Sequence, residues 1–139
     1  MKLKVISGIC LAMATLLYAC QNEEEITFKR YYTTGSLIYQ NSCQNCHGKD
    51  GQGLSALMPA LTDSAFLRTN KALLPCLIKY GIKGKLLIIN KKPFEGDMPS
   101  SDLAPIEIAE VLTYVNNSFG NNMGLTTVKG VESDLAKCK

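Results

Sequence analysis

The sequence predicts a small all-α domain, and three observations support this fold class. Apolar side chains recur every three or four residues around residues 32–46 and 105–119, which is the period of an amphipathic helix. The apolar run over residues 86–89 is too short to assign and is expected to be irregular. The length of 139 residues suits one domain with one modest core.

The composition excludes several classes of function. The formal net charge is only +3, without the strong basic excess of a nucleic-acid-binding surface, so no nucleic-acid partner is expected. The chain has a single histidine, His47. A two-histidine zinc site, a three-histidine metal site and a haem held between two histidines are therefore excluded. Six cysteines are many for a small cytosolic domain, and each needs an explanation.

The N-terminus has the features of an export signal. Lys2 and Lys4 precede an uncharged apolar run over residues 5–17. This run is too short to span a bilayer, but it has the length of a signal-peptide core. Leu17-Tyr18-Ala19-Cys20 follows and resembles the lipobox of bacterial lipoproteins, in which the cysteine is lipidated and becomes the first mature residue. The alternative is an ordinary signal cleaved near Ala19, with Cys20 as a free thiol.

These features predict three parts of the chain. Residues 1–19 form a lipoprotein signal peptide, residues 20–30 a flexible solvated tether rich in glutamate, and residues 31–139 the folded domain. The mature protein is expected to be exported and lipid-anchored to a bacterial membrane through Cys20, facing the periplasm or the cell surface.

The segment Cys43-Gln44-Asn45-Cys46-His47 is C-x-x-C-H, the attachment motif of c-type haem. On a helical turn, residues i and i+3 share a face, so both thiols reach the two vinyl groups at one porphyrin edge. His47 then lies where an imidazole binds the iron as the proximal ligand. The motif therefore predicts one covalently attached haem c with its iron.

Two other interpretations of the cysteine pair are weaker. A thioredoxin-like redox pair needs a preceding strand, and half of a zinc site needs a second pair of ligands. The pattern before Cys43 is helical, because Tyr32, Gly35 and Tyr39 fall on one face with Cys43 and Cys46. No second C-x-x-C and no second histidine exists in the sequence.

From this motif outward, the chain resembles the class I cytochrome c family over about residues 30–135. Gly35 and Tyr39 match the glycine and aromatic residue of the family's N-terminal helix. Glu95-Gly96-Asp97-Met98-Pro99 is similar to the distal-ligand loop, and residues 108–120 are similar to the C-terminal helix. The glycine-rich loop after the haem motif is matched by Gly48, Gly51, Gly53, Pro59 and Leu61. The resemblance implies a small class I cytochrome c fold, with helices packed around one covalently bound haem, and a Pro59 carbonyl that accepts a hydrogen bond from His47.

The second axial ligand must be sought among other residues, because no second histidine exists. Met58 lies shortly after His47, in the loop expected to cover the proximal side, and Met123 lies in a glycine- and asparagine-rich stretch near the end. Met98 is far enough along the chain to return on the opposite face, and the following proline restricts it to extended conformations. We favour Met98 over the other two; a methionine that only fills a core gap is the alternative.

The rest of the chain predicts three further helices. Asn70 is a candidate cap for a helix over residues 71–80. Pro105 and Glu107 suit the first and third positions of the next helix. Thr127 is expected to begin a last short helix that ends near Lys137. The expected core stripe of the second of these helices is Ile108, Val111, Leu112, Val115 and Phe119.

Cys76 and Cys138 are the two thiols that remain once haem, lipid and the signal peptide account for the others. An exported chain lies where disulfides form. We therefore predict a Cys76–Cys138 disulfide that holds the C-terminal tail against the helix over residues 71–80. The family resemblance does not imply this pairing.

A thioether ligand favours ferrous iron, and two filled axial positions leave no open site for a substrate. The sequence thus predicts an electron-transfer protein and no enzyme: a membrane-anchored monohaem cytochrome that exchanges single electrons with respiratory redox proteins. The alternatives are a haem enzyme or gas sensor with a labile distal site, a haem subunit of a larger oxidoreductase complex, and a thiol oxidoreductase. A lysine cluster is either a solvated surface or a docking patch for an acidic redox partner; it comprises Lys79, Lys83, Lys85, Lys91 and Lys92.

Overall fold

The computed structural model describes residues 6, 8–9, 13, 23–84, 86–89 and 91–138. Most of the predicted signal peptide, the lipidation candidate Cys20 and the patch residue Lys85 lie outside the described residues. Among the helices of the described part, none is long and apolar enough to cross a membrane.

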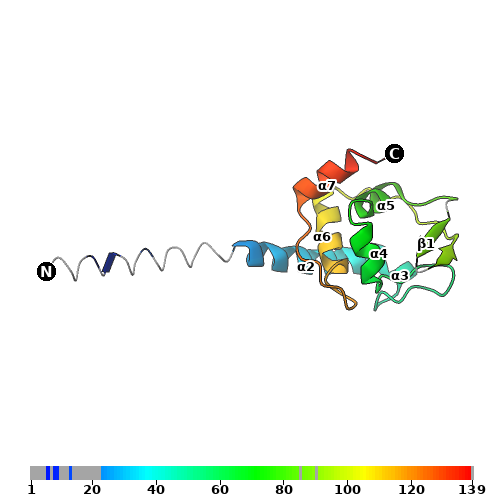
Figure 1. Ribbon diagram of the computed structural model, residues 1–139, viewed down its shortest axis with the longest axis horizontal. Helices are drawn as coiled ribbons and strands as arrows, with labels where there is room; N and C mark the ends of the chain where they lie inside the picture. Colours follow the sequence, from blue (N-terminus) through cyan, green and yellow to red (C-terminus); the bar gives the residue numbers. More distant parts are fainter. Residues whose placement is uncertain are drawn as a thin grey trace.

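The described chain is mainly helical, as predicted, with one small β-hairpin (Figure 1). Antiparallel β1 and β2 pair Leu87 with Phe94 and Ile89 with Lys92. The hairpin lies at the end of the molecule opposite the start of α2, and α7 lies beside α5 and α6 (Figure 1). The elements in chain order are α2 (Glu23–Ser42), α3 (Gln44–His47), α4 (Ser64–Thr69), α5 (Leu74–Tyr80), β1 (Leu87–Ile89), β2 (Lys92–Phe94), α6 (Pro105–Val115) and α7 (Val128–Leu135).

The crossing of α2 and α6 forms the centre of the core. Gly35 is buried on α2, and a Cβ atom placed there would lie 2.0 Å from the carbonyl oxygen of Glu110 on α6. Only glycine permits this approach of the two backbones. Tyr39, one turn further along α2, packs its ring against Tyr114 and Phe119 at centroid distances of 5.4 and 5.2 Å. The predicted apolar stripe of α6 is buried up to Val115, while Phe119 lies beyond the end of the helix.

The expected flexible tether over residues 20–30 is wrong from Glu23 onward, because α2 begins there and continues without a break to Ser42. Three glutamates occupy its first turn, where negative charge is favourable at a helix N-terminus. Glu25 also forms an ion pair with Lys29 at 2.7 Å, and the hydrogen bond from Lys29, together with its positive charge, lowers the pKa of Glu25. Local charge pairing thus supports helix in a segment that has few apolar residues.

The predicted helix over residues 71–80 begins later, at Leu74, and Asn70 does not cap it. Pro75 explains the late start, because a proline in the first turn loses no helical hydrogen bond. Asn70 instead ends α4, where both its backbone N–H and its side-chain Nδ2 donate to the carbonyl of Phe66. Helix α4 was not predicted, although Asp63 is a capping signal: its Oδ1 accepts from the backbone N–H groups of residues 65 and 66.

The two C-terminal helices begin where the sequence predicts. Pro105 is the first residue of α6, and the Glu107 carboxylate accepts from the backbone N–H of Ala104 at 2.7 Å. Thr127 caps α7 by accepting from the N–H of Gly130. The short run 86–89, which was expected to be irregular, contains β1, because Leu87–Ile89 pairs with β2. The chain turns back through Lys91 at a φ of 62°.

Candidate haem site

The cysteine pair lies on a helical turn that continues from α2. The N–H of Cys43 donates to the Tyr39 carbonyl, and the N–H of His47 donates to the Cys43 carbonyl, both at 2.9 Å. Both thiols are free, with Cys43 half-buried and Cys46 exposed. Burial raises the pKa of the Cys43 thiol, with a smaller contribution from Cys46. A helix, rather than the strand that a thioredoxin-like pair needs, precedes the motif.

His47 is held by the loop that follows it. Its Nδ1 lies 3.2 Å from the carbonyl oxygen of Pro59, the partner that the family resemblance implies. Burial lowers the pKa of His47, although the Pro59 hydrogen bond opposes this shift. The ring is therefore neutral near pH 7, which is the form that binds a metal, and Nδ1 donates to Pro59 so that Nε2 is left for a ligand bond.

The loop from Gly48 to Leu61 closes tightly behind this histidine. The N–H of Gly53 donates to the His47 carbonyl at 2.8 Å, and the N–H of Leu61 donates to the Gly51 carbonyl at 2.7 Å. Gly53 has a φ of 68°, and a Cβ there would lie 2.3 Å from the Met58 carbonyl oxygen. The hydroxyl of Tyr39 donates to the Gly48 carbonyl at 2.6 Å and links this loop to α2.

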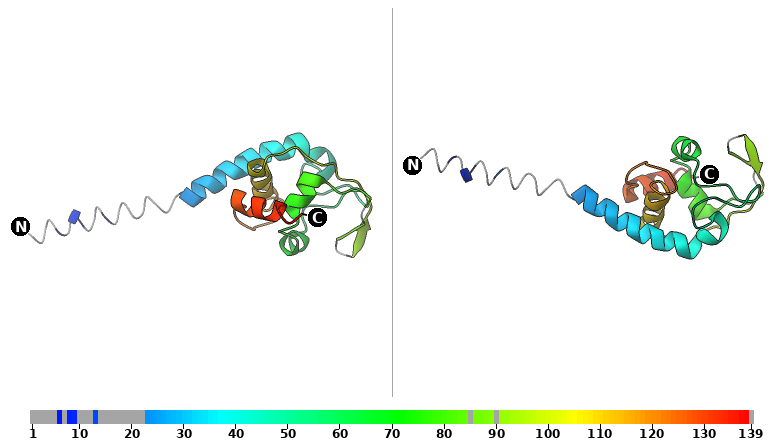
Figure 2. Two further views of the ribbon diagram at one scale, coloured as in Figure 1. Left: turned by 90° about the horizontal axis from the view of Figure 1, so that it is seen from above. Right: turned by 90° about the horizontal axis from the view of Figure 1, so that it is seen from below.

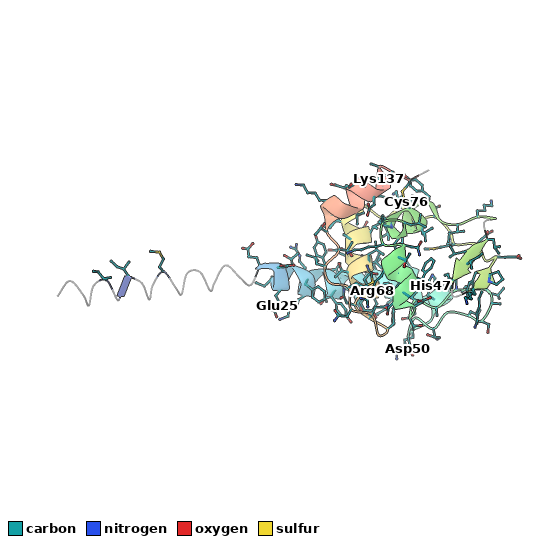
Figure 3. All side chains as sticks on the ribbon, viewed as in Figure 1. Glu25, His47, Asp50, Arg68, Cys76 and Lys137 are labelled. Carbon is teal, nitrogen blue, oxygen red and sulfur yellow. A yellow bond between two sulfur atoms is a disulfide. The ribbon has the colours of Figure 1, made fainter. Side chains whose placement is uncertain are left out.

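His47 faces an apolar cavity with about 730 Å³ of empty space, part of it open to solvent. Its walls come from α2, α4, α5, β1 and α6, so elements from the whole chain build it. Lining residues include Leu67, Leu77, Ile89 and Val111. Two further hollows share lining residues with it, one smaller and one larger and more open, and His47 and Met98 line all three. Figure 3 shows His47 in the half of the body that carries the hairpin.

Met98 is held in place by the segment that follows α5. Its N–H and carbonyl form a two-way bridge with Ile82, with both hydrogen bonds at 2.8 Å. Gly81 packs so closely that a Cβ there would lie 2.3 Å from the Met98 carbonyl oxygen. On the other side of the loop, the Ser101 hydroxyl donates to the Ile78 carbonyl at 3.0 Å, and the Asp97 carboxylate accepts from the N–H of Gly84.

The other two candidate methionines lie elsewhere. Met58 lines only the hollow beside Cys46, and its backbone pairs with Leu54 in the loop on the histidine side. Met123 packs against the α2–α6 core and lines none of the three hollows. The structure thus brings Cys43, Cys46, His47, Pro59 and Met98 together around one space. The clamp on Met98 by Gly81 and Ile82 was missed, and the only sequence signal for it is the glycine at the end of α5.

A disulfide joins Cys76 on α5 to Cys138 beyond α7 (Figure 3). It lies away from the cavity, on the side where α5, α6 and α7 meet. The bond connects the helix that supports the Met98 loop to the C-terminal end of the chain.

The donor set fits a c-type haem. Two free thiols stand three residues apart on one helical turn, while a neutral imidazole and a thioether share an apolar cavity. Such a site within a small helical domain defines the class of single-haem proteins with covalent attachment.

A family model described as Cytochrome c matches residues 32–118, and the chain belongs to this family. No curated protein matches the chain. Membership confirms the predicted small class I cytochrome c fold, and it implies covalently bound haem c with its iron. The protein is therefore a haem-binding electron-transfer protein.

Proposed function

We propose that the protein is a membrane-anchored monohaem cytochrome that exchanges single electrons with respiratory redox proteins. Cys43 and Cys46 form the two thioether bonds, His47 is the proximal iron ligand, and Met98 is the distal one. The observation that supports this assignment best is that His47 and Met98 both line the main cavity and both of its adjoining hollows. Haem c supplies a one-electron iron couple, and the chain's residues set its surroundings.

Those surroundings favour electron transfer over catalysis. The Pro59 carbonyl fixes the His47 ring, and the Ile82 bridge fixes the Met98 backbone, so neither ligand needs to move when the iron changes charge. Apolar walls exclude water and disfavour the more highly charged oxidised iron. A thioether acts in the same direction, because soft sulfur prefers ferrous iron.

The proposed location is the surface of a bacterial membrane, facing the periplasm or the cell exterior. The support is the signal-like N-terminus and the lipobox-like segment that ends at Cys20. One acyl chain anchors a protein only marginally, whereas several chains on one cysteine anchor it stably.

The proposed partners are acidic redox proteins that meet the lysine patch. Lys83, Lys91 and Lys92 are exposed around the hairpin, and Lys79 is half-buried because its Nζ donates to the Leu103 carbonyl at 3.1 Å. The side chains of Leu86 and Ile88, close to these lysines in sequence, are also exposed. Exposed basic side chains attract an acidic partner and speed its approach.

The ligand assignment is tested by Met98→Ala in the holoprotein. We expect the variant to keep its covalent haem, to lose the weak red charge-transfer band that thioether ligation gives ferric haem in this family, and to fall in reduction potential. Met58→Ala and Met123→Ala are the matched controls and should keep the band. A band that survives in Met98→Ala and disappears in either control would reassign the ligand.

The alternatives make different predictions for the unmodified protein. A gas sensor or haem enzyme with a labile distal site would bind carbon monoxide tightly in the ferrous state, whereas the proposed carrier would not. A haem subunit of a larger oxidoreductase would co-purify with a catalytic chain from solubilised membranes. A thiol oxidoreductase would give no haem stain on a denaturing gel.

A further inference from the structure

The helix that carries the haem motif also begins next to the proposed lipid anchor. α2 starts at Glu23, three residues after Cys20, and ends at Ser42, one residue before Cys43. In Figures 1 and 2 this helix extends from the N-terminal side along the body, and its first turns project beyond the other helices. Figure 3 shows Glu25 at the projecting start of α2 and His47 in the body, on the side that carries the hairpin.

The packed part of α2 is fixed to the body and cannot pivot freely. Gly35 is locked against the backbone of Glu110, and the hydroxyls of Tyr32 and Ser118 are hydrogen-bonded at 3.0 Å. Tyr31 and Tyr39 are buried on the same helix. A change in the direction of α2 would therefore break core packing.

The projecting part of α2 is held helical by its own side chains. Glu25 and Lys29 form an ion pair one turn apart, and the rings of Phe28 and Tyr32 stack at 6.0 Å. The helix has no proline, and its only glycine, Gly35, lies inside the packed part.

The length of this unbroken helix sets a lower limit on the distance between Cys20 and Cys43. At about 1.5 Å per residue, the 20 residues of α2 span roughly 30 Å. The three residue steps from Cys20 to Glu23 reach about 10 Å when fully extended. Whatever path they take, Cys20 and Cys43 stay at least about 20 Å apart.

We propose that α2 is a rigid strut that holds the haem end away from the bilayer, so that the partners are proteins whose redox centres reach into the aqueous phase. A quinol dissolved in the bilayer is then a poor direct donor. This inference rests on the proposed lipid anchor at Cys20. Each exchange moves one electron between the haem iron and the partner's centre, so that one is reduced while the other is oxidised, and no bond forms or breaks.

Charge favours an upright strut on an anionic surface. Glu23, Glu24 and Glu25 are exposed in the turn next to the anchor, and anionic headgroups repel them. The nearest positive charges along the helix are Lys29, which is paired with Glu25, and Arg30, which lies over the ring of Tyr31. The exposed lysines Lys83, Lys91 and Lys92 belong to the hairpin and the segment before it. The hairpin lies far from the first turns of α2 (Figure 1).

The test uses lipidated holoprotein in vesicles of phosphatidylethanolamine and phosphatidylglycerol that carry a headgroup-labelled fluorescent lipid and a quinol. Haem quenches the label only at short range, so quenching reports how close the haem comes to the bilayer. Lys29→Pro puts a hinge into the projecting turns, and Lys29→Ala removes the same ion pair but keeps the helix. A flexible Gly-Ser insertion between Asn22 and Glu23 is a second hinge that leaves α2 intact.

We expect both hinged variants to quench the lipid label more strongly than the unmodified protein, and to accept electrons from the bilayer quinol several-fold faster. Lys29→Ala should match the unmodified protein, and all forms should react equally with dissolved ascorbate. Equal quenching and equal quinol rates in hinged and unmodified proteins, with acyl chains confirmed by mass spectrometry, would overturn the strut alone. A mature N-terminus without acyl chains would overturn the anchor and the strut together.

Discussion

At the scale of single residues, Glu110 is a buried acidic side chain whose ionised form is unfavourable in the folded protein. It lies on the buried side of α6, and burial raises the pKa of its carboxyl; Arg30 opposes this shift and Glu107 adds to it. A raised folded-state pKa contributes stability below the unfolded pKa, and that contribution is lost as the pH rises through the folded pKa. At neutral pH the ionised carboxylate therefore weakens the fold.

Glu110→Gln should remove this penalty. We expect the variant to melt at a higher temperature than the unmodified holoprotein near pH 7, and the difference to shrink toward zero near pH 4, where both side chains are neutral. Thermal unfolding followed by circular dichroism at the two pH values checks this. A variant that melts lower than the unmodified protein at pH 7 would contradict it.

Gly81 and Gly84 form a matched pair for testing the support of Met98. Both have positive φ angles, of 70° and 60°, so alanine is strained at each. An added Cβ meets the Met98 backbone only at Gly81, whereas nothing lies within 4 Å at Gly84. Gly81→Ala should therefore weaken the thioether charge-transfer band and lower the reduction potential, while Gly84→Ala keeps both. Equal spectra in the two variants would show that strain alone acts.

At the scale of elements, Gly35 sets how closely α2 and α6 approach. The Cβ of Gly35→Ala would collide with the Glu110 backbone, so the helices must separate. We expect the variant to lose about 1–3 kcal/mol of unfolding free energy in denaturant titrations, as overpacked cores do. Thr33→Ala, at an exposed position on the same helix, is the control and should stay within about 0.5 kcal/mol of the unmodified protein.

The Cys76–Cys138 disulfide fixes the C-terminal end to α5. Its cysteines are 62 residues apart in sequence, so the chain-entropy model gives about 4 kcal/mol of stabilisation. Replacing both by serine should lower the unfolding free energy by that order and leave the haem spectrum unchanged, because neither lines the main cavity. Replacing either cysteine alone should lower the unfolding free energy nearly as much as replacing both, because each change breaks the same bond. A double variant as stable as the unmodified protein would show that the bond contributes nothing.

Helix starts that depend on residues within one turn could be predicted from the sequence. Pro105 with Glu107 marked the start of α6, and Thr127 marked that of α7, because capping depends on residues within one turn. The haem-binding turn is likewise local. The start of α5 was predicted too early because Asn70 has the side chain of a helix cap, whereas Pro75 places the first turn of the helix at Leu74.

Most contacts between distant segments could not be predicted from sequence patterns; the Cys76–Cys138 disulfide is an exception, because the other thiols already had a role. The Ile82–Met98 bridge joins residues on either side of the hairpin, and Gly35 meets Glu110 from another helix. Such contacts depend on how whole elements pack, which spacing along the chain does not encode. The helical start at Glu23 was missed because charge pairing, rather than an apolar stripe, supports it.

At the scale of the whole molecule, we expect the position of the charged side chains to affect association with a redox partner more than the small net charge of +3 does. Lys83, Lys91 and Lys92 are exposed at the haem end. Basic groups near a docking surface act mainly on the association rate. Changing these lysines to glutamate should therefore slow reduction by an acidic redox protein more than changing three lysines elsewhere.

Changing Lys83, Lys91 and Lys92 together to glutamate should slow the second-order reduction of the holoprotein by an acidic redox protein by about tenfold or more at low salt. High ionic strength should bring the rates together, because salt screens exposed charges. The control reverses three exposed lysines elsewhere, Lys29, Lys71 and Lys129, and changes the net charge equally. Stopped-flow measurements over a salt series compare the two. If both triple variants slow equally, net charge rather than a docking patch governs the encounter.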